Sequence, residues 1–294
     1  MRLERFTETG SFARVARPFL ERWEIEHALL LGLIAALEAG EPVGEAPAYH
    51  AVVTGEEGVE LVALMTPPQQ LLLSRVGTIE ALSPLTADLL ASEWRVPGVL
   101  GPPEGARQFT QLWSAASHQA YAIAMEERLF VLERVQPVTG VPGMMCWATA
   151  VDRPWLVDWL TRFVVEAQKT LAAEARERAE RMADRRLRED GKERAGYCVW
   201  IDGQPVALAG YGGATPQGII RIGPVFTPLE FRRRGYATAL TAALSQWLLD
   251  VGYRFCTLYT DLANPTSNKI YQRVGYRPVC DVTAIRFGTS ETGR

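Results

Sequence analysis

Between a strand-like and a helix-like segment, the chain reads Arg232-Arg233-Arg234-Gly235-Tyr236-Ala237. Residues 219–227 are rich in Ile and Val, which predicts a strand, and residues 237–249 carry apolar side chains at helical spacing. A tight loop that leads from a strand into a helix favours an anion, because the first helical N–H groups lack partners and the helix dipole attracts negative charge. The arginines add positive charge. The segment therefore predicts a site for a phosphate group.

Two other phosphate-binding patterns do not fit this loop. The pattern G-x-x-x-x-G-K-[ST] is absent from it. A dinucleotide-binding turn needs G-x-G, whereas this strand-to-helix junction has a single glycine, Gly235. R-x-x-G-x-A is a weak signal by itself, and a solvated basic loop that closes onto a helix cap is the alternative interpretation.

A second group of residues lies further along the chain. Residues 254–262 predict another strand, and after it the chain reads Asn264-Pro265-Thr266-Ser267-Asn268-Lys269-Ile270-Tyr271-Gln272-Arg273-Val274-Gly275-Tyr276. Asn264 is a typical helix N-cap, and Pro265 suits the first helical position. Gly275 can end the helix in the left-handed conformation. We therefore expect a short helix that carries Tyr271 on its second turn.

In this order and spacing, the two motifs resemble the GNAT superfamily of acetyl-CoA-dependent N-acetyltransferases. The motifs R-x-x-G-x-A and N-P-x-S-N-x-x-x-Y-x-x-x-G-Y span residues 219–277, and the wider resemblance reaches from residue 144 to residue 287. The resemblance implies the GNAT fold, a mixed α/β sheet with flanking helices. It also implies an enzyme that uses acetyl-CoA as acyl donor and moves the acetyl group to a primary amine, by direct attack of the amine on the thioester.

The resemblance implies the cofactor-binding residues as well. The loop amides that hold the pyrophosphate map onto Arg233, Arg234, Gly235, Tyr236, Ala237 and Thr238, with Arg232 beside them. The splayed strand end that pairs with the pantetheine arm maps onto Val225, Phe226 and Thr227. The helix-capping asparagine and the helical tyrosine, which face the thioester, map onto Asn264 and Tyr271.

Tyr271 is the candidate catalytic residue. When an amine attacks a thioester, the departing thiolate needs a proton or a hydrogen bond, and a phenol near the sulfur can supply either. General acid help of this kind contributes roughly 10²–10⁴-fold to a rate. The alternative interpretation is that Tyr271 is a core aromatic on a buried helix face. Backbone N–H groups from Val225 to Thr227 are candidates for polarising the thioester oxygen.

The sequence does not indicate the general base. All three histidines, His27, His50 and His118, lie in the first half of the chain, outside the matched motifs. Carboxylates of the second half are the candidates: Glu166, Glu174, Asp202, Glu230, Asp261 and Asp281. For each of them a surface charge or a cap is the alternative interpretation. A water chain or an already neutral amine would also serve.

Composition limits the class of protein. The 294 residues suffice for two domains, and 31 Lys and Arg against 34 Asp and Glu argue against general nucleic-acid binding. The apolar run at residues 28–37 is too short for a membrane span, so we expect a buried helix there, no membrane or secretory segment, and a cytoplasmic protein. Reduced core thiols, rather than disulfides or a metal site, are expected at four cysteines without a C-x-x-C pair: Cys146, Cys198, Cys256 and Cys280.

The rest of the second half predicts a mixed sheet with flanking helices. We expect strands at residues 144–149, 197–201, 206–211 and 279–287, and helices at residues 155–168 and 171–190. Asp202-Gly203 is a favoured turn pair for a hairpin of the two middle strands. Glu174 with Arg178 and Glu177 with Arg181, each four residues apart, support a solvated helix.

The first half repeats this order of elements. We expect a helix at residues 12–39, strands at 49–54, 59–65 and 70–76, a helix at 86–93, a strand at 96–100, a helix at 105–116 and a strand at 128–135. The repeat suggests a tandem GNAT-like protein. Its domains would cover residues 1–137 and 144–294, joined by a linker at residues 138–143.

The first half lacks both motifs. Where the phosphate loop is due it has Ser74-Arg75-Val76-Gly77-Thr78, and the helix after Gly101-Pro102-Pro103 lacks the N-P-x-S-N pattern. We therefore expect one cofactor site, in the second half. The degenerate first domain is expected to shape the substrate cleft or an interface.

Two classes of function follow from these observations. The favoured one is a GNAT-type N-acetyltransferase acting on a small-molecule or peptide amine. The alternative is a non-catalytic acyl-CoA-binding or regulatory module that retains the GNAT fold. The intact loop and Tyr271 favour the enzyme, since an interaction module needs neither. The acceptor amine and the oligomeric state are not indicated by the sequence.

Overall fold

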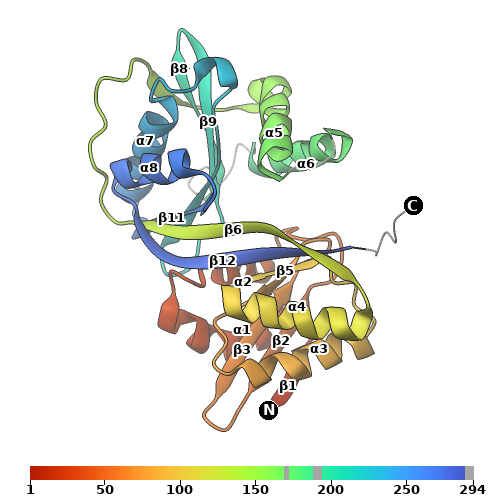
Figure 1. The fold of residues 1–294 in the computed structure, drawn as a ribbon. Helices are drawn as coiled ribbons and strands as arrows, with labels where there is room; N and C mark the ends of the chain where they lie inside the picture. Colours follow the sequence, from red (N-terminus) through yellow and green to blue (C-terminus); the bar gives the residue numbers. More distant parts are fainter. Residues whose placement is uncertain (169–171, 188–193, 289–294) are drawn as a thin grey trace. The chain divides into compact units, whose positions relative to one another are not determined.

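The computed structural model describes residues 1–168, 172–187 and 194–288, which fold into two compact units. The first unit comprises Met1–Leu129, Asp261–Ala263 and Val279–Arg294, and the second comprises Phe130–Thr260 and Asn264–Pro278. Each unit is a mixed sheet with helices on both faces (Figure 1).

The first unit follows the repeating order that its sequence predicts. Its elements are β1 (Arg2–Phe6), α1 (Thr9–Leu20), η1 (Glu21–Trp23), α2 (Ala28–Glu38), β2 (Tyr49–Thr54), β3 (Val59–Met65), β4 (Leu71–Leu73), η2 (Ile79–Ala81), α3 (Leu82–Ala91), β5 (Gly98–Gly101) and α4 (Pro103–Ser117). The strands lie in the order β1-β2-β3-β4-β5-β12, where β12 is Arg277–Gly288. β4 and β5 are parallel, and the other neighbouring pairs are antiparallel.

Both faces of this sheet are buried, which explains the continuous apolar runs of its central strands. On β2, Ala51 and Val53 face the cluster built from α3 and α4, whereas Val52 faces the cluster built from α1 and α2. On β3, Ala63 and Val62 divide between the two clusters in the same way. Side chains alternate across a strand, so one apolar run supplies two cores.

The second unit has the same arrangement. Its elements are the end of β6 (Ala120–Leu132), whose residues up to Leu129 belong to the first unit, then β7 (Met144–Trp147), η3 (Ala150–Asp152), α5 (Arg153–Gln168), α6 (Ala172–Arg186), β8 (Gly196–Asp202), β9 (Gln204–Gly212), β10 (Ile219–Phe226), η4 (Leu229–Phe231), α7 (Tyr236–Asp250), β11 (Phe255–Asp261) and α8 (Pro265–Val274). The strand order is β6-β11-β10-β9-β8-β7. Helices α7 and α8 cover one face, and α5 and α6 cover the other (Figure 1).

The last strand of each half of the sequence packs into the core formed by the other half. Phe130 and Leu132 of β6 belong to the cluster under α7 and α8, whereas Ile285 and Phe287 of β12 belong to the cluster under α3 and α4. The expected domain boundary at residues 137–144 lies inside the second unit. Each unit is therefore completed by a strand from outside its own half of the sequence.

The prediction of one continuous helix at residues 12–39 is wrong, because the structure has two α-helices there, α1 and α2. His27 Nδ1 donates to the Leu20 carbonyl at 2.9 Å, so a side chain takes a carbonyl that a continuous helix would bond through its backbone. The strand expected at 70–76 ends at Leu73, because Ser74 Oγ replaces a backbone carbonyl as the acceptor for Val62 N–H.

Other boundaries also differ from the expectations. β6 starts at Ala120 rather than residue 128, and its first residues are exposed, so they lack the buried pattern of a strand. β1 was not expected from the sequence. The helix expected at 171–190 is observed as α6, with residues 171 and 188–190 outside the described part.

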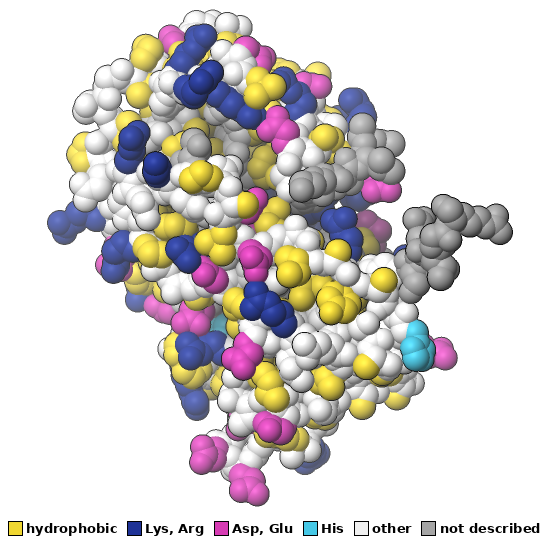
Figure 2. Space-filling view, in the orientation of Figure 1, with side chains coloured by type: hydrophobic (Ala, Val, Ile, Leu, Met, Phe, Trp, Pro, Cys, Tyr) yellow, Lys and Arg dark blue, Asp and Glu magenta, His cyan; other side chains and the backbone are white. Residues whose placement is uncertain are grey.

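The four cysteines are free thiols, of which Cys198 and Cys256 are buried as expected, whereas Cys146 and Cys280 are only half-buried. Within the described ranges, no group of three or more His, Cys, Asp or Glu side chains could hold a metal ion. No helix of the described residues has the length and hydropathy needed to span a bilayer. Figure 2 shows charged side chains of both signs spread over the visible face, as the near-neutral composition leads one to expect.

Candidate active site

The candidate site begins where strands β10 and β11 separate. They pair in parallel only from Ile219 with Phe255 to Arg221 with Thr257. On its other edge, β10 shifts register against β9 between Ile222 and Val225. The irregularity begins where the pairing with β11 ends, and the backbone groups of β10 beyond Arg221 lie outside that ladder. An open strand edge is therefore available next to the loop that follows.

The three residues at the end of β10 face in different directions. Val225 packs in the cluster under α7 and α8, together with Tyr236 and Tyr271. Phe226 faces the opposite side, where its ring lies 6.1 Å from Trp159 of α5. Thr227 follows the strand, and its Oγ1 is buried without a hydrogen-bond partner among the described atoms.

The arginine-rich loop leads directly into α7, as the sequence predicts. Gly235 is the N-cap and has φ +85°, a left-handed conformation that favours glycine. The first helical bond runs from Ala239 N to Gly235 O, so the N–H groups of residues 236–238 precede the ladder. Arg233 and Arg234 are exposed beside them. A helix N-terminus and two cationic side chains thus face the same loop.

Three contacts hold this loop in place. The Arg232 guanidinium donates to Thr227 O at 2.8 Å and to Glu166 Oε2 of α5 at 2.6 Å. The Tyr236 hydroxyl donates to Asp202 Oδ2, at the end of β8, at 2.6 Å. Gly235 packs so closely that a Cβ atom there would lie 2.9 Å from Val141 Cγ2. The loop is therefore anchored by α5, by the end of β8 and by Val141.

Tyr271 lies on the second turn of α8, as expected, and is 9% exposed. Burial raises its pKa to about 12, because the phenolate loses solvation. Its ring contacts Tyr276 edge-on at 6.0 Å, and the described residues give its hydroxyl no hydrogen-bond partner. The Tyr276 hydroxyl, in contrast, is bonded to Ser245 Oγ at 2.9 Å. Tyr271 is thus a protonated phenol with an uncommitted hydroxyl.

Helix α8 starts where the sequence predicts. Asn264 precedes the helix and is exposed, and Pro265 is its first residue. Asn268 N–H donates to Asn264 O at 3.3 Å, and the Thr260 hydroxyl donates to Asn268 Oδ1, which ties the end of β11 to the helix. Gly275, with φ +109°, follows the last helical residue.

The carboxylates considered as general bases are mostly engaged by other groups. Glu166 pairs with Arg232, Glu230 with Arg162 at 3.6 Å, and Asp202 accepts from Tyr236. In the first unit, Arg128 binds Asp281 through two hydrogen bonds and lowers the pKa of that carboxyl, and Asp261 accepts from Ala263 N–H. Glu174 is exposed on α6. None of them is singled out as a base.

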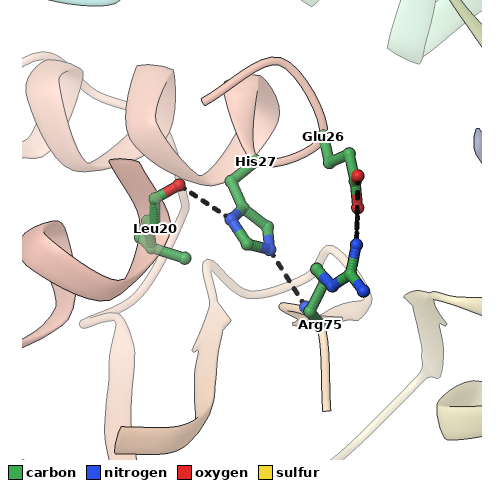
Figure 3. Close-up of polar contacts among 4 residues, drawn as sticks. All are labelled: Leu20, Glu26, His27 and Arg75. Carbon is green, nitrogen blue, oxygen red and sulfur yellow. Dashed lines mark hydrogen bonds and ion pairs between the residues drawn. The ribbon is translucent and has the colours of Figure 1, made fainter. Parts of the chain in front are cut away.

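The corresponding loop of the first unit is closed by its own side chains (Figure 3). His27 Nε2 accepts the Arg75 N–H at 3.0 Å, so a loop amide is already bonded. The Arg75 guanidinium pairs with Glu26 at 3.2 Å and lies 4.7 Å from the centre of the Trp23 ring. This loop therefore offers a ligand neither the amide nor the guanidinium of Arg75.

The model of the acetyltransferase (GNAT) family matches residues 157–276, which include the separated strands, the arginine-rich loop and α8. This segment is a GNAT domain. The GNAT assignment indicates an acyltransferase. A search of the curated proteins finds no match.

Solved structures match over nearly the whole chain. A protein from Drosophila has a TM-score of 0.66 at 11% identity, over 97% of this chain and 98% of its own. A GCN5-related N-acetyltransferase from Sphaerobacter thermophilus has a TM-score of 0.59 at 17% identity, over 97% and 95%. A tandem GNAT protein from the clavulanic acid biosynthesis pathway has a TM-score of 0.55 at 11% identity, over 100% of both chains. At these identities the likeness shows the fold, which is a GNAT fold in tandem.

Sequence reasoning missed the residues that support the loop. Glu166 and Asp202 were considered only as bases, and Val141 only as part of a linker. Arg162 and Glu166 lie four residues apart on α5, which is a signal that they share one helix face. The sequence gives no signal that this face meets the loop.

Proposed function

We propose that the GNAT domain transfers the acetyl group of acetyl-CoA to a primary amine of a small molecule or peptide. One observation carries this proposal: β10 separates from β11 immediately before a loop that opens the N-terminus of α7. The open strand edge offers hydrogen bonds to an amide-containing arm, and the helix N-terminus offers N–H groups to a pyrophosphate. A ligand with both parts in series matches the order of these groups along the chain.

The residues at this site fit acetyl-CoA. The pyrophosphate would be held by the N–H groups of residues 235–238 and by the side chains of Arg233 and Arg234. The pantetheine arm would lie along the freed edge formed by Val225, Phe226 and Thr227. The buried, unpartnered Oγ1 of Thr227 supports this assignment, because a buried hydroxyl without a partner is rare in a native protein. Asn264, at the start of α8, would face the acyl end.

Acetyl-CoA supplies a thioester, whose carbonyl carbon accepts an amine as the carbon–sulfur bond breaks. The role we assign to Tyr271 is to give its phenolic proton, or a hydrogen bond, to the departing sulfur. Its pKa of about 12 keeps the proton in place at neutral pH, and its hydroxyl is not committed to another residue of the described chain. Backbone N–H groups from Val225 to Thr227 would polarise the thioester oxygen. The incoming amine loses its proton to water or arrives neutral, since no side chain is assigned as base.

The proposal is tested by mixing the full-length protein with acetyl-CoA and a panel of amines and following thiol release. Polyamines, aminoglycosides, amino acids and a peptide with a free amino terminus cover the acceptor classes. We expect at least one amine to raise thiol release above the rate without acceptor, and mass spectrometry to find that amine heavier by one acetyl group. Binding of CoA without release by any amine would favour the non-catalytic module instead.

A further inference from the structure

Two ion pairs connect α5 to the loop between β10 and α7. Arg232 Nη2 lies 2.6 Å from Glu166 Oε2, and Arg162 Nη2 lies 3.6 Å from Glu230 Oε2. Each element contributes one positive and one negative side chain, and on α5 the two are one helical turn apart. The pairing is therefore reciprocal, and sliding the loop along the helix would bring like charges together.

Arg232 also contacts Phe226 and Thr227, the two residues where β10 ends and the loop begins. Its Nε donates to Thr227 O at 2.8 Å, which closes the chain between the end of β10 and the beginning of the arginine run. Its guanidinium lies 5.9 Å from the centre of the Phe226 ring, and that of Arg162 lies 5.6 Å from the same centre. Phe226 is 4% exposed, so this base of the loop is firmly packed.

The ion pair between Arg232 and Glu166 adds little to the free energy of unfolding of the whole protein. The side chains of Arg232 and Glu166 are 37% and 44% exposed. Exposed ion pairs of this kind contribute little to the free energy of unfolding, because water and salt screen them. Their place is more informative than their strength: Arg232 lies three residues before Gly235, where the free amides of α7 begin.

We infer that Glu166, acting through Arg232, positions the loop that binds the pyrophosphate, and that Arg232 is not itself a phosphate ligand. The guanidinium of Arg232 is hydrogen-bonded to Thr227 O and to the Glu166 carboxylate, whereas Arg233 and Arg234 are exposed beside the helix N-terminus. The inference rests on the proposed function for its effect on acetyl-CoA. The positioning itself is a property of the free protein.

The test compares the wild type with Glu166→Ala, Arg232→Ala, the double variant and the conservative Glu166→Gln. Hydrogen–deuterium exchange is measured without ligand at the amides of Phe231, Arg232 and Ala239, which are hydrogen-bonded in the loop and the first turn of α7, and KM and kcat are measured with acetyl-CoA. We expect each alanine variant to speed exchange and raise the KM for acetyl-CoA about fivefold, with kcat unchanged. The double variant should equal Arg232→Ala, because Glu166 acts only through Arg232, whereas Arg232 also holds Thr227 O. Glu166→Gln should lie between the wild type and Glu166→Ala, because its amide oxygen still accepts from Arg232.

Glu177→Ala is the matched control, because Glu177 and Arg181 form an exposed ion pair at 2.7 Å on α6. It should change neither exchange at Phe231, Arg232 and Ala239 nor the KM for acetyl-CoA. Additive effects of Glu166→Ala and Arg232→Ala would overturn the inference, since they would give Arg232 an independent contact with the ligand. The inference would also be overturned if Glu166→Ala left the exchange of the loop amides unchanged in a protein that binds acetyl-CoA. Faster loop exchange in a protein that does not bind acetyl-CoA would instead overturn the proposed function and leave the positioning in place.

Discussion

At the scale of single residues, two buried tyrosines on and just after α8 differ in the hydrogen bonding of their hydroxyl groups. Tyr276 is buried and its hydroxyl is bonded to Ser245, which is a structural use of a phenol. Tyr271 is buried beside it, but no described residue takes its hydroxyl. A desolvated phenol without a partner favours a ligand that supplies one, and this contrast supports Tyr271 as the proton donor of the proposed reaction.

Tyr271→Phe should lower kcat about 100-fold, because it removes the proton donor to the departing sulfur. The KM for acetyl-CoA and the melting temperature should change little, since the ring and its packing are retained. Steady-state kinetics with the best amine of the panel and a thermal melt measure these quantities.

Tyr276→Phe is the matched control. It should lower the free energy of unfolding by about 1 kcal/mol, because one buried hydrogen bond to Ser245 Oγ is lost while the bond from Ser245 Oγ to Thr241 O stays, and should leave kcat near the wild-type value. A kcat for Tyr271→Phe equal to that of the wild type would remove Tyr271 from the catalytic residues.

His27 makes stability depend on pH. Its ring donates to Leu20 and accepts from Arg75, so it is neutral in the fold, and burial lowers its pKa below the ordinary value of about 6.5 despite the opposing charge of Glu26. As the pH falls below that value the unfolded chain gains a proton that the folded chain does not, so stability is lost toward acid. Burial lowers the pKa of His50 as well, which adds to the loss.

The free energy of unfolding should therefore fall between pH 7 and pH 5, by up to about 1.4 kcal/mol per pH unit for each histidine. His27→Gln should reduce this slope by roughly half, because one of the two neutral imidazoles is removed. Urea unfolding at several pH values measures the slope. His118→Asn, at an exposed position, is the control and should retain the full slope; an unchanged slope in His27→Gln would exclude His27 as a source.

At the scale of elements, the loop before α7 depends on a single glycine for two reasons. Gly235 has a left-handed backbone, and a Cβ atom there would press on Val141. Gly252, after the other end of α7, also has a positive φ of +107°, but no atom lies within 4 Å of where its Cβ would be. Substitutions at the two glycines therefore distinguish the effect of backbone strain, which both would show, from the effect of crowding against Val141, which only Gly235 would show.

Gly235→Ala should destabilise the protein by about 1–2 kcal/mol and weaken CoA binding strongly, because the loop must move away from Val141. Gly235→Glu should abolish binding, since it also places negative charge beside the pyrophosphate. Calorimetric titration with CoA measures the affinity. Gly252→Ala should cost similar stability and leave CoA affinity unchanged; if the two alanine variants bind CoA equally well, the loop does not hold the ligand.

The order of the elements could be predicted from the sequence, but some boundaries could not. Periodicity and the capping residues around Asn264 and Gly275 give α8 correctly. The break between α1 and α2 depends on a hydrogen bond from His27, and the end of β4 on one from Ser74, and such side-chain bonds leave no periodic signal. The loop of the candidate site was visible in its residues, whereas its support by Glu166 arises only when α5 packs.

At the scale of the whole molecule, we predict that the two halves of the sequence do not fold independently, because the last strand of each half packs in the core formed by the other. Fragment 1–137 lacks Ile285 and Phe287, which fill the core under α3 and α4. Fragment 144–294 lacks Phe130 and Leu132, which fill the core under α7 and α8. No sequence pattern marks this, because the periodicity of a strand shows that it is buried and not which sheet buries it.

Each fragment made alone should be unstable, since losing two large core side chains costs several kcal/mol against a total stability of about 5–15 kcal/mol. We expect broad, non-cooperative melts and aggregation for both. Produced together, the fragments should associate and recover a cooperative transition. A sharp melt of fragment 144–294 alone would show that its core closes without β6.

The exchange of terminal strands also sets an order of events during synthesis. Domains of a growing chain usually fold from the N-terminus onward while the rest is still being made. Here the first unit lacks β12 until the second half of this sequence has been made. Until then the core under α3 and α4 lacks Ile285 and Phe287, and the apolar side chains that they cover stay exposed to water.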